Sequence, residues 1–189
     1  MAGAIIHTTC LLAALVAADG GAPSNERAKS SQRAEVEAAL AKGGSPGELQ
    51  HWAATADGTL MALAGNRAAS ETVRGRALAA LAYARTGRVR AFLENFVIEK
   101  TPSSAAVDRV LVRRAAVSLG WQAGPRAVEV IAPLLDSSDV EVRLDAAAAL
   151  GLTRLSDAEK PLRVRLAIES DPSVKRQIES ALKAVTAAR

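Results

Sequence analysis

Apolar and small residues recur at helical spacing between Asp139 and Gly151. Four of them stand at positions i, i+4, i+7 and i+8, on one stripe of a helix: Val142, Ala146, Ala149 and Leu150. A stripe of this kind is buried against a neighbouring element. Gly151 follows the last apolar residue and predicts the end of the helix, because glycine readily adopts the left-handed conformation that terminates many helices. The pattern therefore predicts an amphipathic helix that packs through its alanines and its leucine.

The same pattern, an aliphatic and a basic residue followed by small residues and a leucine, returns three more times, once in a looser form. The leucines that close the four copies lie 31 to 38 residues apart, at Leu81, Leu119, Leu150 and Leu182. A period of this length is typical of stacked helix pairs. Second helical stretches fill the intervals, at residues 88–98, 125–135 and 158–168. The chain is therefore predicted to be all-α, a right-handed α-solenoid of about four helix pairs.

Turn and cap residues bound the predicted units. These units are a degenerate N-terminal repeat at 32–70, clearer repeats at 71–100, 101–136 and 137–170, and a C-terminal helix at 171–189. Ser138 and Ser156, each followed three residues later by glutamate, predict capping boxes at two helix starts. Pro125 and Pro172 are expected at first helical positions. Pro133 lies inside a predicted helix and should kink it or restart it.

The stretch from Asp139 to Gly151, together with Pro125–Val128 and Leu134–Asp136 before it, resembles bacterial HEAT repeats, including the HEAT-like repeats of phycobilin lyases. The resemblance covers residues 71–189 well and residues 35–70 more loosely. It implies a stack of helix pairs with a long accessible surface. It leaves the function open, because the family includes scaffolds, lyase subunits and nucleic-acid enzymes.

Residues 1–18 contain no charged side chain and hold an apolar run of signal-peptide length that ends in small residues. They are interpreted as a secretory signal cleaved after Ala18, which predicts a secreted or periplasmic protein. The alternative is a buried N-terminal helix in a cytoplasmic protein. The run is shorter than the roughly 20 residues that a membrane span needs, so no span is expected in the mature chain. Residues 19–31 combine glycine, proline and mixed charges and are predicted to be a flexible leader.

Side chains that carry catalysis are sparse. The two histidines, His7 and His51, have no acidic residue or cysteine at metal-ligand spacing, so no metal site is predicted. The Gly-Gly pairs lack the lysine and the serine or threonine of a phosphate loop. No serine stands out as a nucleophile that His51 would activate. We therefore predict no cofactor and no catalytic residue.

Basic residues cluster in the middle of the chain, and acidic residues follow them. Residues 72–93 carry five arginines and no acid, and residues 109–128 carry four arginines and no acid. Four acids then fall within residues 136–145. Some of the basic residues have a structural explanation, because HEAT stacks that resemble this chain carry ladders of charge between repeats. The expected ladder consists of Arg74, Arg143 and Lys175, at equivalent repeat positions, with acids such as Asp145.

The other arginines either form a solvated face or bind an anionic partner. Arg88 and Arg90 open one second helix and Arg126 opens the next, so stacking in register should bring them together. The candidate partner-binding residues are Arg85, Arg88, Arg90 and Arg126. Pairing with Glu94, Glu99 and Glu129 is the competing explanation for them.

The predicted function is a non-catalytic scaffold that binds a protein partner, because repeats make a long surface and no constellation for chemistry stands out. The partner is expected to be an acidic protein or another polyanion and not a small substrate, and a nucleic acid is the less favoured partner. The resemblance implies two alternatives. One is a protein similar to alkylpurine DNA glycosylases, which would use the basic middle of the chain, although Tyr83, Phe92 and Trp121 are too scattered to form a pocket for an extruded base. The other is a HEAT protein similar to bilin lyases, with no residue match beyond the repeat.

Overall fold

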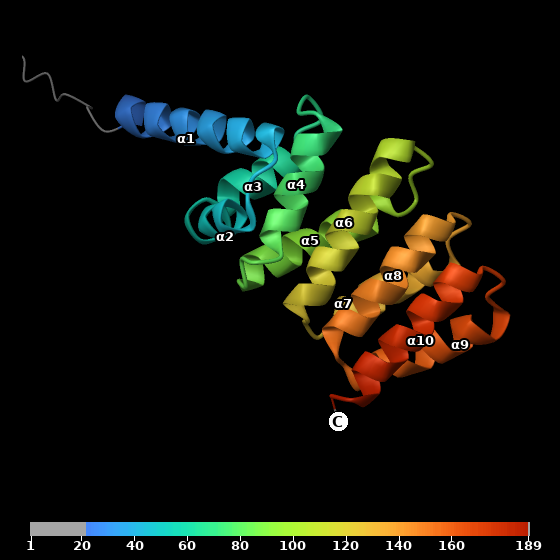
Figure 1. Ribbon diagram of the computed structural model, residues 1–189. Coiled ribbons are helices and arrows are strands. Elements are labelled where there is room, and N and C mark those ends of the chain that lie inside the picture. Colours follow the sequence, from blue (N-terminus) through green and yellow to red (C-terminus); the bar gives the residue numbers. More distant parts are fainter. Residues whose placement is uncertain (1–21, 189) are drawn as a thin grey trace, which may run out of the picture.

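The computed structural model describes residues 22–188, and within them the chain is helical without any strand. In chain order the helices are α1 (Ala22–Lys42), α2 (Pro46–Thr55), α3 (Asp57–Gly65), α4 (Glu71–Leu81), α5 (Gly87–Lys100), α6 (Ala106–Gln122), α7 (Ala127–Ile131), η1 (Ala132–Asp136), α8 (Val140–Thr153), η2 (Ser156–Ala158), α9 (Glu159–Ile168) and α10 (Pro172–Thr186), where η marks a 3₁₀ helix. The helices stack in sequence from one end of the molecule to the other (Figure 1). The predicted all-α solenoid is confirmed.

The helices form two layers. The four that carry the recurring leucine pattern, α4, α6, α8 and α10, pack side by side and are called the motif layer below. A second layer, made of α3, α5, α7 with η1, and α9, packs on the motif layer. Neighbouring motif helices contact one another along their lengths, whereas neighbours within the second layer touch only lightly. The motif helices run in the same direction, so their C-terminal ends follow one another along one edge of the molecule (Figure 1).

The motif layer is held together by the residues that the sequence pattern singles out. The recurring leucines are all buried: Leu81, Leu119, Leu150 and Leu182. The predicted stripe of α8 is buried as well, with Val142, Ala146, Ala149 and Leu150 all inside the core. Burial of apolar surface stabilises this layer, and alanine at two of the four stripe positions of α8 lets helix backbones approach closely. The predicted helix faces are therefore the observed ones.

Gly151 does not end its helix as predicted. Helix α8 continues past it, and the left-handed residue at its end is Arg154, with a φ of 53°. The glycine instead allows close packing, because a Cβ atom added there would lie 2.9 Å from the Cα of Ala181 on α10. Gly120 holds the equivalent position on α6, and a Cβ there would lie 3.0 Å from the carbonyl carbon of Ala149 on α8. Both glycines mark helix contacts, not helix ends.

The first helix begins earlier than predicted. Helix α1 starts at Ala22, so residues 22–31, predicted to be part of a flexible leader, are helical. The prediction weighed only the lack of apolar surface, whereas the alanine, glutamate, arginine and lysine of this segment have good helix propensity. The side chains of residues 25–31 are exposed, and α1 is anchored further along by the buried Val36 and Leu40.

The rest of the N-terminal predictions lie outside the described residues. This applies to the secretory signal at residues 1–18 and to the leader before residue 22. Among the helices of the described region, none combines the length and the apolar character needed to cross a membrane.

Two helix starts differ from the predicted capping boxes. Helix α8 is capped by Asp139, whose carboxylate accepts hydrogen bonds from the amides of Glu141 and Val142. Ser138 therefore lies one residue outside the cap, and Glu141 stands too early in the helix to bond back to it. Ser156 opens the short helix η2, which has no side-chain cap.

The prolines act at helix boundaries. Pro46 and Pro172 stand at the starts of α2 and α10, where a missing amide costs no helical hydrogen bond. Pro125 was predicted at the first position of a helix. It lies instead in the turn before α7, which begins at Ala127. Pro133 stands where the α-helical α7 gives way to the 3₁₀ helix η1, so the predicted restart at this proline is confirmed.

Candidate protein-binding surface

Of the three predicted ladder residues, Arg143 pairs with an acid, although the acid is Glu169 and not Asp145. The Arg143 side chain is buried, and its Nε and Nη2 donate to the two carboxylate oxygens of Glu169 at 2.8 and 3.1 Å. Its Nη1 donates to the backbone carbonyls of Ser137 and Ser138. These hydrogen bonds from Arg143, helped by one from Arg165, lower the pKa of Glu169 from 4.5 to about 2. The pair therefore joins the loop before α8 to the loop before α10.

The other two ladder positions are occupied differently. Arg74 is buried like Arg143, but its Nε donates to the carbonyl of Ala64, 3.1 Å away, and meets no carboxylate. The loop after α5 offers serines where the loop before α10 offers Glu169. Lys175 is exposed on α10 and makes no ion pair with any described residue. The predicted three-step ladder is therefore reduced to one step.

Asp145, predicted to serve this ladder, pairs instead with an arginine of α6. Its carboxylate accepts from Arg113 Nε at 2.7 Å, and Arg113 Nη2 also donates to Glu141 at 2.9 Å. One turn earlier on α6, Arg109 Nε donates to Asp139 at 3.1 Å. The basic stretch of α6 and the acidic stretch of α8 thus face each other across a seam of ion pairs. The sequence carried the signal, because these partners lie about one repeat period apart.

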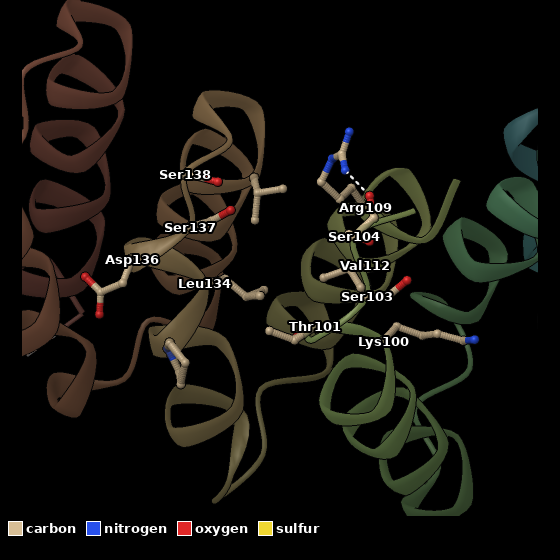
Figure 2. Close-up of a pocket in the computed structure, with 12 residues that line it drawn as sticks. Lys100, Thr101, Ser103, Ser104, Arg109, Val112, Leu134, Asp136, Ser137 and Ser138 are labelled. Atoms are coloured by element: carbon tan, nitrogen blue, oxygen red, sulfur yellow. Dashed lines mark hydrogen bonds between the residues drawn. The ribbon is translucent and has the colours of Figure 1, made fainter. Parts of the chain in front are cut away.

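A hollow of about 420 Å³ lies between the loops at 101–104 and 136–138 (Figure 2). Val112 lines it and occupies the repeat position that Arg143 fills in the next repeat. Valine leaves open the space that a guanidinium fills there. The two cations at the rim are already engaged, Arg109 with Asp139 and Lys100 with Asp108. Within residues 22–188 no three histidine, cysteine or acidic side chains are grouped so that they could hold a metal ion.

Two of the candidate partner-binding arginines pair with acids but stay largely exposed. Arg88 bonds Asp57 of α3, and 66% of its side chain remains accessible. Arg126 lies 3.6 Å from Glu94 and 3.8 Å from Glu129, with 53% of its side chain accessible. Exposed pairs of this kind contribute only about 0 to 1 kcal/mol. Both arginines can therefore exchange these partners for others at little cost.

The other two candidates, Arg85 and Arg90, form no ion pair with the described residues. Arg85 is exposed in the turn between α4 and α5. Arg90 packs over the backbone of Gly124, where an added Cβ would lie 2.7 Å from its Nε. That Nε is buried without a hydrogen-bond acceptor. The start of α5 and the turn before α7 are thus in contact, which brings Arg90 and Arg126 onto adjacent segments, whereas Arg88 bonds an acid of α3.

Two aromatic residues, dismissed as scattered in the sequence, lie at neighbouring helix ends. Trp121 and Tyr83 are 51% and 47% exposed, and each follows the recurring leucine of its helix by two residues. Gln122 ties these helix ends together, because its Nε2 donates to the carbonyls of Leu81 and Ala84 at 2.8 and 3.0 Å. Tyr83 and Trp121 share the second position after the recurring leucine. This shared position in the sequence would have indicated that the two residues lie at neighbouring helix ends.

Comparison with known proteins relates part of this helical stack to a known family of repeats. Residues 104–183, from just before α6 into α10, match the family of HEAT repeats. No curated protein matches the chain. The matched segment contains three of the four motif helices and both glycine contacts between them. HEAT repeats commonly form helical scaffolds that bind other proteins. The sequence match over residues 104–183 and the two-layer stack together support a HEAT-repeat domain in this chain.

Proposed function

We propose that the protein is a non-catalytic scaffold whose HEAT repeats bind an acidic protein partner. The observation that carries the proposal is a set of arginines, at the starts of α5 and α7, that the protein's own acids do not fully neutralise. Arg85 and Arg90 form no ion pair with described residues, and Arg88 and Arg126 are more than half exposed in theirs. Cations left available in this way attract and orient an acidic surface.

The basic middle of the chain gives less support to a nucleic-acid partner. Arg109 and Arg113, half of the arginines in the second basic stretch, are engaged by the acids of α8. Binding to nucleic acid depends on neutralising several phosphates with free cations. The four candidate arginines come from the turn after α4 and the starts of α5 and α7, and not from a row along the whole stack, which favours a compact acidic site on a protein.

The proposal is tested by removing charge without adding bulk. We expect the variant Arg85→Gln/Arg88→Gln/Arg126→Gln to lose a partner that the wild-type protein captures from host extract at low salt. Capture by the wild type should weaken as salt rises, because exposed ionic contacts are screened. Arg90 is left in place because its packing over Gly124 contributes to the fold.

The matched control is Arg27→Gln/Lys29→Gln/Arg33→Gln, which removes as many positive charges from exposed positions on α1. This control should keep the partner. If both variants melt like the wild type and capture the same proteins, these arginines are only solvated and the proposal is wrong. Equal loss in both variants would mean that net charge, and not this surface, drives the capture.

We further propose that the protein is exported and cleaved after Ala18. The support is the uncharged, apolar character of residues 1–18 and the small residues before Asp19. Mass spectrometry of the protein purified from its native host should find Asp19 at the N-terminus. Recovery of the chain with Met1 intact in a soluble cytosolic fraction would contradict export.

A further inference from the structure

One corner of the molecule combines two exposed aromatic side chains with two arginines that form no ion pair with any described residue. We call the residues Tyr83, Arg85, Arg90 and Trp121 the aromatic corner. Hydrogen bonds from Gln122 to the carbonyls of the turn after α4 bring the C-terminal end of α6 against that turn. The packing of Arg90 over Gly124 brings the start of α5 to the same place. The four residues thus come from three segments that are in contact.

The corner is positively charged. Helix α5 has no acid in its first turn, where Arg88 adds a third cation. The nearest acid on that helix, Glu94, is buried and lies 3.6 Å from Arg126. The positive end of the α5 backbone dipole points toward the same region. Charge complementarity therefore favours carboxylates as the groups that pair with Arg85 and Arg90.

The corner is also rigid and partly apolar. Gln122 is itself buried, and its three hydrogen bonds hold the residue next to Trp121 in place. Tryptophan is usually highly buried, so an indole that stays half exposed on a fixed backbone presents apolar surface to an incoming group. Tryptophan, tyrosine and arginine are the residues that most often dominate protein interfaces. A rigid site of this composition loses little conformational entropy on binding.

We propose that the aromatic corner binds a segment of the partner protein in which an apolar side chain is flanked by acidic residues. The apolar side chain packs against Trp121 and Tyr83, and the flanking carboxylates pair with Arg85 and Arg90. This inference rests on the proposed function and deepens it, because it assigns an anchor and a sequence character to the partner. It differs from purely electrostatic docking in requiring the aromatic residues.

The experiment uses the full chain and a short synthetic peptide with one phenylalanine between glutamates. The chain has two tryptophans, so the indole N–H signals of Trp121 and Trp52 are both observable by NMR, and Trp52 is an internal control. We expect the peptide to shift the Trp121 signal and to leave the Trp52 signal unchanged. Replacing the phenylalanine by alanine, or the glutamates by lysines, should weaken binding by about tenfold or more.

Three protein variants complete the test. Trp121→Ala and Tyr83→Ser should each weaken peptide binding by about fivefold or more. Both variants should keep a melting temperature near that of the wild type, since both side chains are about half exposed. Trp121→Leu keeps apolar bulk and should retain part of the binding. A Trp121 signal that does not move at saturating peptide, or equal affinity for the lysine peptide, would overturn the proposal.

The outcome is separable from that of the proposed function. If Arg85→Gln/Arg88→Gln/Arg126→Gln abolishes capture of the partner and Trp121→Ala leaves it intact, the scaffold function stands and the aromatic corner is not its anchor. If neither variant changes capture, the proposed function fails as well.

Discussion

The guanidinium of the buried Arg143 meets oxygen atoms on several sides. They belong to the carboxylate of Glu169 and to two backbone carbonyls, and Glu169 also accepts hydrogen bonds from the amides of Ser170 and Asp171. Only 3% of Glu169 is accessible, so the ionised carboxylate is stable there because nearly all of its lone pairs are used. The cluster holds together the loop before α8 and the loop before α10, so its removal should destabilise both loops.

The first prediction concerns the pH dependence of stability. The pKa of Glu169 is lowered to about 2 in the folded protein, chiefly by the hydrogen bonds from Arg143, against an ordinary value of 4.5. A folded-state pKa below the unfolded one contributes stability above the unfolded pKa, and that stability is lost as pH falls toward the folded pKa. Urea unfolding of the wild type should therefore show stability falling from about pH 5 to pH 2.

Glu169→Gln should lose about 2 kcal/mol at pH 7 and flatten that acid dependence. The control is Glu179→Gln, at an exposed position on α10, which should leave both the stability and its slope with pH unchanged. If the curves of wild type and Glu169→Gln run parallel between pH 5 and pH 2, Glu169 does not carry the linkage.

Two pairs of motif helices, α6 with α8 and α8 with α10, pack with almost no side chain between their backbones at one point of the contact. Gly120 lies against Ala149, and Gly151 lies against Ala181. The glycines and alanines sit at the same repeat positions, so the close approach repeats along the stack. Because interiors are densely packed, even one methyl group at such a point forces the helices apart.

The second prediction is that Gly151→Ala destabilises the protein by about 1 to 3 kcal/mol through overpacking, although alanine favours helix. Thermal unfolding measured by circular dichroism gives the difference. The matched control is Gly65→Ala at the end of α3, where an added Cβ meets nothing within 4 Å. This control should be neutral or slightly stabilising, by about 0.4 to 1 kcal/mol. If the Gly151→Ala protein is as stable as the Gly65→Ala control, the close contact at Gly151 does not require glycine and the prediction is wrong.

The helices were predictable because their burial depends on local periodicity, as the recurring leucines and alanines show. The charge pairs were harder to assign, because a carboxylate such as Asp145 can meet an arginine at several offsets. The repeat period alone does not select among them, and the partner of Asp145 is Arg113 on α6 and not a residue at the ladder position. The predicted capping residue of α8 was wrong for a similar reason. Ser138 and Asp139 are adjacent and both can cap a helix, and the structure uses Asp139. Of the candidate surface, the arginines were predictable from composition, whereas the aromatic residues needed the register between α4 and α6.

At the scale of the whole molecule, the stack is a series of units that contact only their neighbours, so its ends depend on few interactions. The N-terminal end is closed by α1, whose Leu40 is fully buried and whose last carbonyls accept hydrogen bonds from Arg76 of α4. The earlier part of α1 extends beyond the stack with exposed side chains (Figure 1). The two parts of one helix therefore contribute unequally to stability.

The third prediction follows from this difference. A chain that begins at residue 32 should keep the melting temperature of a chain that begins at residue 25, because the exposed residues 25–31 bury no apolar surface. Leu40→Ala, by contrast, should lose about 2 to 5 kcal/mol through the cavity it leaves. Differential scanning calorimetry of both variants tests the contrast. A large drop in the truncated chain would show that the extension packs on the stack in solution.

The light contacts within the second layer have a mechanical consequence. Motif helices are joined by close backbone contacts and ion pairs, so we expect that layer to resist stretching when the molecule bends. Bending should then be taken up in the second layer, between α5 and α7, where Arg126 lies 3.6 Å from Glu94. A load applied to the ends of the molecule should therefore change the distance between Arg126 and Glu94 before it separates the motif helices.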